Sequence, residues 1–191
     1  MNRQCKGTAD GVHSDVQVVE RPNRERHFDV LLRFLGLSLT LVATIIVGVD
    51  KETKLISYAG LQFKATAKWE YMSAIVYFLV ANAIACSYAA SSLVITGMAR
   101  SMGRHEVAEL VLTVVDLVIM ALLFSANGAA SAVGVLGQKG NSHVEWMKVC
   151  NVFDAYCRHI TAAIILSLVG STVFLLLVLH SVFKLHQRSS Y

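Results

Sequence analysis

The sequence has 191 residues, of which 55% are hydrophobic and only 16% are charged, whereas a soluble domain carries nearer a quarter of charged residues. This composition excludes an ordinary water-soluble domain. The net charge is +4, but the basic residues are spread over every polar segment without a run of four or more, so no nucleic-acid-binding surface is expected.

The apolar stretches of the chain are continuous, which predicts membrane-spanning helices rather than the alternating segments of about 10 residues that a β-barrel uses. Four stretches reach the roughly 20 residues that a hydrocarbon core requires. They cover Phe28–Val49, Tyr71–Ala99, Val107–Leu136 and Ile160–Phe183. The single proline, Pro22, precedes all of them, so each can form an unbroken helix. We therefore predict an all-α membrane protein that folds as a four-transmembrane-helix bundle.

The polar segments define the predicted domain limits and the topology. An N-terminal tail covers residues 1–27, the transmembrane domain residues 28–183 and a C-terminal tail residues 184–191. The first tail lacks the apolar centre of a signal peptide, so the first span is expected to act as the insertion signal. An even number of spans puts both tails on one side, which carries nine basic residues against seven on the other. This excess of Lys and Arg predicts that both tails are cytoplasmic.

Two ionisable side chains lie inside the predicted spans, Arg33 in the first and Asp116 in the third. A lone charge near the bilayer centre costs about 3 kcal/mol on insertion scales, so such residues usually face protein. At about 1.5 Å per residue, Arg33 lies about 8 Å and Asp116 about 14 Å into the membrane. An extended arginine covers this difference, which favours an ion pair that locks the fold or an assembly interface. Two alternatives stay open: Arg33 extends to the headgroups, or a protonated Asp116 bonds to a neighbouring helix.

Polar and small side chains in the second and third spans predict sites of helix packing. Asn82 and Asn127 both fall in the outer half of the membrane, where an amide pair contributes about 1 kcal/mol. Gly128 follows in a stretch rich in alanine and serine, and the second span holds a similar set. Small residues let helices approach closely, which indicates either packing within one bundle or contact between subunits.

Cys150 and Cys157 lie in the predicted loop before the fourth span. If this loop is extracellular, its oxidising surroundings favour a disulfide. In a straight helix the two residues would be about 10.5 Å apart, beyond the roughly 4.4 to 6.8 Å between the Cα atoms of a disulfide. The chain must therefore bend back on itself if the bridge forms, and the alternative is free or differently paired thiols. Cys86 lies within the second span, where a packing role is expected.

Motifs for catalysis or cofactor binding are not found in the sequence. The seven histidines are scattered without a His-Glu-x-x-His motif, and no set of cysteines and histidines has the spacing of a zinc site. No glycine-rich phosphate-binding loop precedes a helix. We therefore expect neither an enzyme nor a bound metal or cofactor.

The order of several short motifs resembles a known family. The motifs are Arg33, Val76–Cys86, Asp116 followed by Leu122–Ala130, and the loop residues Trp146, Cys150, Phe153 and Cys157. Over about residues 28 to 186 they resemble the Casparian strip membrane proteins of land plants, and more closely the CASP-like branch, group one. The resemblance implies a MARVEL-like four-helix bundle in the plasma membrane, with cytosolic termini, that forms homodimers, heterodimers and larger assemblies. The true Casparian strip members carry a short signature in the first extracellular loop, and the segment Asp50 to Glu70 lacks it.

The resemblance also implies a function, because the true Casparian strip members are scaffolds that form an immobile membrane domain and gather wall-modifying enzymes. We expect a self-associating scaffold whose partners are further copies, related family members, membrane lipid and secreted wall-modifying enzymes. The alternative is a proton- or ion-linked transporter or channel that uses Arg33 and Asp116. Against it, the sequence has no obvious inverted repeat and no span broken by glycine and proline.

Overall fold

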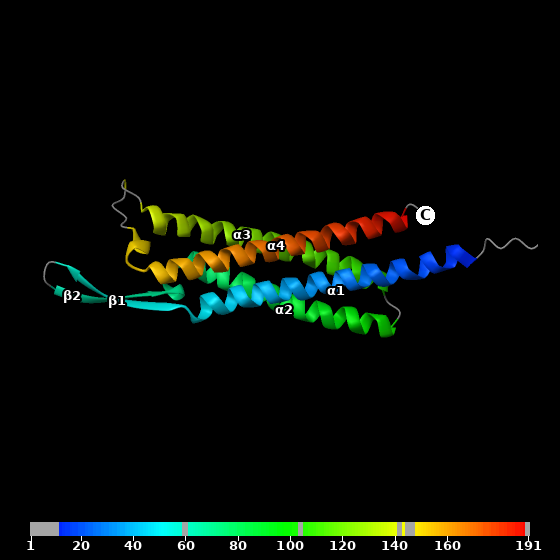
Figure 1. The fold of residues 1–191 in the computed structure, drawn as a ribbon, viewed down its shortest axis with the longest axis horizontal. Coiled ribbons are helices and arrows are strands. Elements are labelled where there is room, and N and C mark those ends of the chain that lie inside the picture. The colour runs from blue at the N-terminus through cyan, green and yellow to red at the C-terminus, as the bar shows by residue number, and fades with distance from the viewer. Residues whose placement is uncertain (1–11, 59–60, 103–104, 141–142, 144–147, 190–191) are drawn as a thin grey trace, which may run out of the picture.

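Four long helices, each antiparallel to the next along the chain, form a bundle in the computed structural model of this protein (Figure 1). They are α1 (Val12–Val49), α2 (Ser73–Met102), α3 (His105–Lys139) and α4 (Asp154–Ser189). The structure describes residues 12–58, 61–102, 105–140, 143 and 148–189. Each helix contains a segment that is long and apolar enough to cross a membrane. The predicted four-span helical fold class is therefore confirmed.

The helices are arranged around the bundle in chain order. Helix α1 packs against α2 and α4, and α3 packs against the same two helices. Helix α2 ends at Met102 and α3 begins at His105, and so short a connection favours an antiparallel arrangement of these two neighbours. As a result, α1 and α3 lie on a diagonal, facing each other across the centre. The start of α1 and the end of α4 lie at one end, here called the tail end, and the opposite end is here called the hairpin end (Figure 1).

Two of the four helices, α1 and α4, extend clearly beyond their predicted apolar runs. Helix α1 begins at Val12, so the backbone of most of the predicted N-terminal tail is helical. Helix α4 begins at Asp154 rather than near Ile160, and it continues to Ser189, into the predicted C-terminal tail. Hydropathy marks only the part of a helix that is apolar, whereas adding a residue to an existing helix is much easier than starting one. The start of α1 and both ends of α4 therefore lie outside the apolar runs.

A β-hairpin that was not predicted connects α1 and α2. Strand β1 (Lys51–Tyr58) pairs antiparallel with β2 (Leu61–Lys68), in a register that sets Lys51 opposite Lys68 and Tyr58 opposite Leu61. The short 3₁₀ helix η1 (Trp69–Tyr71) then leads into α2. The hairpin projects from the end of the bundle opposite to the tail end (Figure 1). The polar segment between the first two spans is therefore an ordered extension of the fold.

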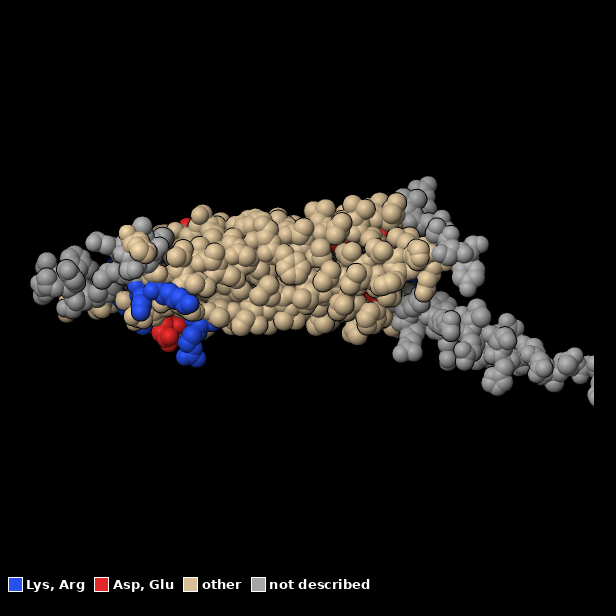
Figure 2. Space-filling view, turned by 90° about the horizontal axis from the view of Figure 1, so that it is seen from above, with Lys and Arg blue, Asp and Glu red and all other residues tan. Residues whose placement is uncertain are grey.

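The interior of the bundle contains two apolar clusters. The cluster at the hairpin end includes the buried side chains of Val47, Ile75, Phe78, Phe153 and Ile160. The cluster nearer the tail end includes Leu32, Leu123, Val173, Phe174 and Leu177. Many large apolar side chains point outward instead, and Figure 2 shows a broad middle band of the surface that is almost free of charged side chains. Such a band fits the hydrocarbon region of a bilayer, where helices associate mainly through close packing and buried polar contacts.

Candidate functional site

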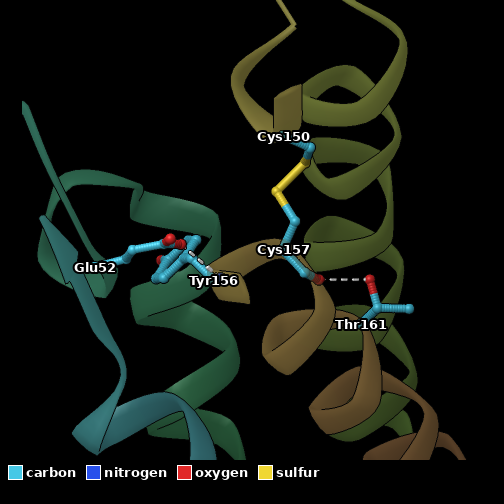
Figure 3. Close-up of a disulfide and its surroundings, with 5 residues drawn as sticks. All are labelled: Glu52, Cys150, Tyr156, Cys157 and Thr161. Atoms are coloured by element: carbon cyan, nitrogen blue, oxygen red, sulfur yellow. Dashed lines mark hydrogen bonds between the residues drawn. A yellow bond between two sulfur atoms is a disulfide. The ribbon is translucent and has the colours of Figure 1, made fainter. Parts of the chain in front are cut away.

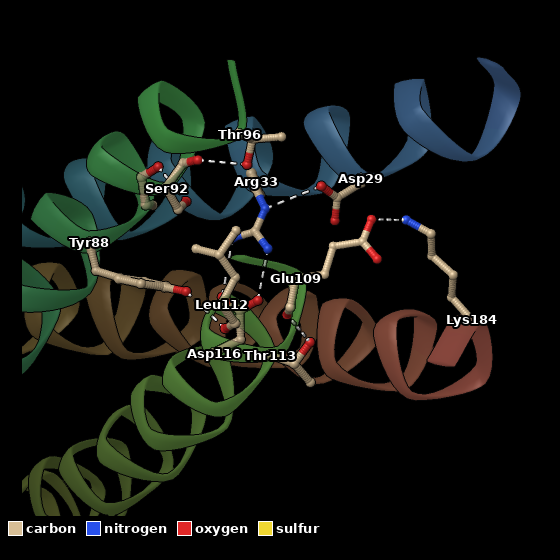
Figure 4. A network of polar contacts seen from close by, with 11 residues as sticks. Asp29, Arg33, Tyr88, Ser92, Thr96, Glu109, Leu112, Thr113, Asp116 and Lys184 are labelled. Carbon is tan, nitrogen blue, oxygen red and sulfur yellow. Dashed lines mark hydrogen bonds and ion pairs between the residues drawn. The ribbon is translucent and has the colours of Figure 1, made fainter. Parts of the chain in front are cut away.

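An ion pair joins α1 to α3 across the centre of the bundle. The Arg33 guanidinium donates from Nη1 to Oδ1 of Asp116 at 3.2 Å and from Nη2 to Oδ2 at 2.9 Å. The two side chains are only 3% and 0% exposed. A guanidinium and a carboxylate that meet through two parallel hydrogen bonds form one of the stronger polar contacts available to a protein. The structure thus brings together the two charges that the sequence singled out, and it directs Arg33 into the bundle instead of toward the headgroups (Figure 4).

Further contacts extend this pair into a network at the tail end (Figure 4). Nε of Arg33 donates to Asp29 one helical turn earlier, at 3.3 Å. The Tyr88 hydroxyl on α2 donates to the carbonyl of Leu112 on α3, at 3.1 Å. An ion pair between Lys184 and Glu109 connects α4 to α3, and the rings of Phe28 and His180 meet between α1 and α4. All four helices are therefore joined at this level.

A second group of polar side chains lies in the middle of the bundle and is here called the central polar layer. It consists of Asn82 on α2, Asn127 on α3, and Ser167 and Ser171 on α4. All four side chains are buried, with at most 1% exposed. The Ser167 hydroxyl donates to Oδ1 of Asn82 at 2.8 Å and accepts from Nδ2 of Asn127 at 3.1 Å. The same Nδ2 lies 3.1 Å from the Ser171 hydroxyl.

The central polar layer differs from the direct amide pair that the sequence suggested. The two amides do not bond to each other, because Ser167 lies between them and makes a bond to each. Each amide also donates to its own helix, to the carbonyl four residues earlier. Ser167 and Ser171 were not predicted to take part, although their spacing places the two side chains on one helix face.

Glycine packing also occurs at positions other than the one predicted. A Cβ added at Gly128 would meet no atom within 4 Å, and the residue is exposed on α3. By contrast, a Cβ at Gly36 would lie 3.3 Å from the Phe174 ring, and one at Gly170 would lie 3.5 Å from Thr40. The close approach of α1 and α4 therefore depends on Gly36 and Gly170. Gly128 makes no such contact within the bundle.

At the hairpin end, Cys150 and Cys157 form a disulfide with their Cα atoms 5.7 Å apart (Figure 3). The bend that this bridge requires is present, because the short 3₁₀ helix η3 (Val149–Asn151) is followed by a turn before α4 begins. The Cys150 sulfur also lies 3.6 Å from where a Cβ on Gly137 of α3 would be. The bridge therefore holds the end of the loop against α3 and α4. Cys86 in α2 is a partly buried free thiol.

The hairpin is bound to the first turn of α4. The backbone N–H groups in the first turn of a helix have no partner within the helix, and the N-terminus favours negative charge. Glu52 supplies both needs, since its Oε2 accepts from the Tyr156 N–H at 2.9 Å. This hydrogen bond, followed by the one from Lys54, holds the pKa of the Glu52 carboxyl below its ordinary value. Asp50 adds a contact of 3.0 Å between its Oδ1 and Nδ1 of His159.

The described residues contain no group of three or more His, Cys, Asp or Glu side chains that could hold a metal ion. Polar groups of the described chain instead bind one another at three levels of the bundle, although Oδ1 of Asn127, Oδ2 of Asp50 and the Tyr156 hydroxyl are buried without a hydrogen-bond partner among the described residues. These levels are the Arg33 network, the central polar layer and the contacts of Glu52 and Asp50 with α4. Their chemistry is that of holding helices in register.

Comparisons with known proteins agree with this architecture. The family model for the Casparian strip membrane protein domain matches residues 22–173. A CASP-like protein 1E1 from Vitis vinifera is 52% identical, over 100% of this chain and 99% of its own length. A CASP-like protein 1E2 from the same plant is 47% identical over 98% of this chain and 100% of its own length, and a CASP-like protein 1E1 from Arabidopsis thaliana is 38% identical over 97% and 100%. No solved structure matches the chain. The chain therefore belongs to the Casparian strip membrane protein family, in the CASP-like branch, group one.

Proposed function

We propose that this protein is a self-associating scaffold of the plasma membrane, which organises a membrane domain and gathers partner proteins without catalysing a reaction. Both tails lie in the cytosol and the hairpin lies outside, an orientation that the nine basic residues on the tail side favour over the opposite one. Family membership supports a role in a membrane. The proposed partners are further copies, related family members and secreted wall-modifying enzymes.

The exposed position of Gly128 on α3 is the observation that carries this proposal. Ala121, Ser125 and Ala132 are exposed as well, and their spacing puts them on the same side of the helix as Gly128. These four residues are here called the small-residue face. In lipid, helices associate through van der Waals contact, and small side chains allow the backbones to approach closely. We assign the small-residue face to contact between copies or with related family members.

The interior of the bundle supports the same assignment. Arg33 and Asp116 are joined to each other, and the central polar layer is bonded within the chain. Gly36 and Gly170 provide the close approach of α1 and α4 within the bundle. Within the small-residue face, Ser125 accepts a hydrogen bond from the Tyr77 hydroxyl of α2 at 3.3 Å. A Cβ at Gly128 would meet no atom within 4 Å, so the part of the face around Gly128 remains open to another helix.

A transporter or channel is the second candidate, because an intramembrane arginine and aspartate can mark an ion path. The contacts argue against it. The Arg33 guanidinium is already bound to Asp116 and Asp29. The apolar cluster nearer the tail end lies between this ion pair and the central polar layer. It includes Leu123 and Phe174, which are at most 1% exposed. An apolar layer of this kind separates the polar groups instead of linking them into a path.

The test replaces Gly128 by leucine and compares it with Gly97→Leu on α2. Neither glycine has an atom within 4 Å of its Cβ position, so both variants should fold. Cross-linking in native membranes and recovery after photobleaching would measure assembly and diffusion. We expect Gly128→Leu to lose cross-linked dimers and to diffuse faster, while Gly97→Leu behaves like the wild type.

Two outcomes would contradict the proposal. A Gly128→Leu variant that still cross-links like the wild type would remove α3 as the interface. A wild-type protein that diffuses freely as a monomer would remove the scaffold itself. A pH-dependent current through reconstituted vesicles, absent in Asp116→Asn, would favour the transporter instead.

A further inference from the structure

The hairpin has two different faces, which its register defines. Neighbouring side chains along a strand point to opposite faces, and residues paired across an antiparallel ladder share a face. One face, here called the inner face, carries Glu52, Lys54, Ala65 and Ala67. The opposite face, here called the outer face, carries as its described side chains Lys51, Thr53, Leu55, Gln62, Lys64, Thr66 and Lys68.

The inner face is bound to the bundle. Glu52 accepts the hydrogen bond from the Tyr156 N–H of α4 and also pairs with Lys54 at 3.0 Å. Ala65 and Ala67 pack against the apolar cluster at the hairpin end. These contacts fix the orientation of the hairpin, so its outer face is turned away from the bundle.

Most of the outer face is exposed in the part of the chain that the structure describes, and only Thr66 and Lys68, near the base of the hairpin, are half-buried. Its two threonine hydroxyls, on Thr53 and Thr66, lie 3.2 Å apart and bond to each other across the strands. Leu55, which pairs with Lys64 in the register, is 71% exposed. An apolar side chain thus lies beside a lysine on a surface that nothing in the described chain covers.

The charge of the outer face is positive and largely uncompensated. Among the described residues, no carboxylate lies within ion-pairing distance of Lys51 or Lys64. Lys68 has Glu70 at 3.9 Å, in an exposed position where such a pair contributes little. Lys51 and Lys68 are directly opposite each other in the ladder, an arrangement that destabilises a sheet when both are charged.

We propose that the outer face docks an acidic, extended segment of a partner protein on the outer side of the membrane. This inference rests on the proposed function, which supplies the orientation and the need for partners. Carboxylates of the partner would neutralise lysines that now repel each other, and complementary charge also speeds and orients the encounter. The exposed Leu55 offers an apolar contact between the charges, which suits a polypeptide whose acidic residues alternate with apolar ones.

Lys64 distinguishes a protein partner from the headgroups of the protein's own membrane. Lys51 and Lys68 lie at the base of the hairpin, next to the end of the first span and the 3₁₀ helix η1. Lys64 precedes Lys68 by four residues in β2 and therefore lies about 13 Å closer to the tip of the hairpin. A headgroup contact would therefore depend on the two lysines at the base, whereas a docked segment would depend on Lys64 as well.

The test uses the full-length protein in neutral phosphatidylcholine vesicles. The probe is a short labelled peptide in which glutamate alternates with threonine and leucine, and the control peptide has glutamine in place of each glutamate. Lys64→Gln on the outer face is compared with Lys54→Gln on the inner face, because both remove one positive charge from the same hairpin. We expect the acidic peptide to bind more tightly than its control, Lys64→Gln to weaken binding about fivefold, and Lys54→Gln to have little effect.

Equal binding of the two peptides, or equal loss in Lys64→Gln and Lys54→Gln, would overturn the proposal. So would binding of polygalacturonate, a carboxylated sugar polymer, that depends on Lys64 while the peptide does not bind. The Gly128→Leu variant should bind the acidic peptide like the wild type. Docking and self-association are thereby measured separately, so failure of one is distinguishable from failure of the other.

Discussion

The two ends of the bundle are held together by different chemistry. At the tail end, the Arg33–Asp116 pair is buried among four membrane-spanning helices. At the hairpin end, a disulfide and the Glu52 carboxylate hold the loop and the hairpin against α4, at the limit of the spans. Water, salt and reductants reach the second set of contacts far more easily than the first. The buried pair is thus shielded from changes in the solution, while the hairpin end is the part that such changes can alter.

Of the changes considered for the two ends, removing the Asp116 carboxylate is expected to lower the free energy of unfolding most. Asp116→Ala leaves the Arg33 charge buried without its partner, so the free energy of unfolding should fall by about 3 to 5 kcal/mol. Unfolding in mild detergent, followed by circular dichroism, measures the change. The control is Asp29→Ala, because Asp29 is partly exposed and bonds only to Nε, and its loss should cost less than about 1 kcal/mol.

A double variant sharpens the same prediction. Replacing Arg33 by methionine and Asp116 by leucine removes both charges, so the double variant should be much more stable than Asp116→Ala alone. If Asp116→Ala were as stable as the wild type, the ion pair would not be what holds α1 to α3.

The disulfide is expected to have the next largest effect. Cys150→Ser, or a reductant acting on the wild type, should lower stability by about 2 kcal/mol, because the bridge closes a short loop. Hydrogen exchange should rise around η3 and the first turn of α4 and stay unchanged near Arg33. Adding the reductant to Cys150→Ser should change nothing more, and a change in exchange that spread equally to the tail end would contradict the independence of the two ends.

Ser167→Ala tests the central polar layer and should cost about 1 kcal/mol, since it removes the bonds to Asn82 and Asn127. Thr172→Ala is the matched control, because its exposed hydroxyl bonds only to its own helix. Thermal unfolding of the two variants gives the comparison. An equal effect from both would mean that Ser167 does not link the helices.

Acid should weaken the hairpin end, with the smallest effect of the set. The pKa of Glu52 is lower in the folded state than its ordinary value of 4.5. Its contribution is therefore present above that value and is lost as the pH falls through the lower, folded-state pKa. Hydrogen exchange of the Tyr156 amide should rise over this acidic range. In Glu52→Gln this rise in exchange at acidic pH should disappear. If the variant kept the pH dependence of the wild type, a group other than Glu52 would be its cause.

The spans and the ion pair could be predicted because their causes are local to the sequence. Long apolar runs determine where helices cross the lipid, and the depth of Arg33 and Asp116 in their spans follows from the rise of a helix. The role of Ser167 could not be predicted in this way, since serine is common in membrane helices and only the packing of α4 shows which amides it meets. The Glu52 contact joins residues 104 apart in the sequence, and no local pattern indicates it.

The hairpin and the packing glycines were missed for related reasons. The segment from Lys51 to Lys68 is polar and rich in lysine, so hydropathy describes it as a loop, although its backbone pairs in a regular ladder. Gly36 and Gly170 lie in separate spans, and only the crossing of α1 and α4 gives them their role. Gly128 stood out because it lies in a stretch of small residues, but it faces away from the bundle.

The ion pair also has a consequence for biosynthesis. Arg33 enters the membrane with the first helix to be made, but its partner is 83 residues later in the chain. Until the third helix is synthesised, the arginine must remain near the headgroups or keep its helix from settling at its final depth. A nascent chain that stops after α2 therefore holds this arginine without its partner, and the buried pair can form only after Asp116 has been synthesised.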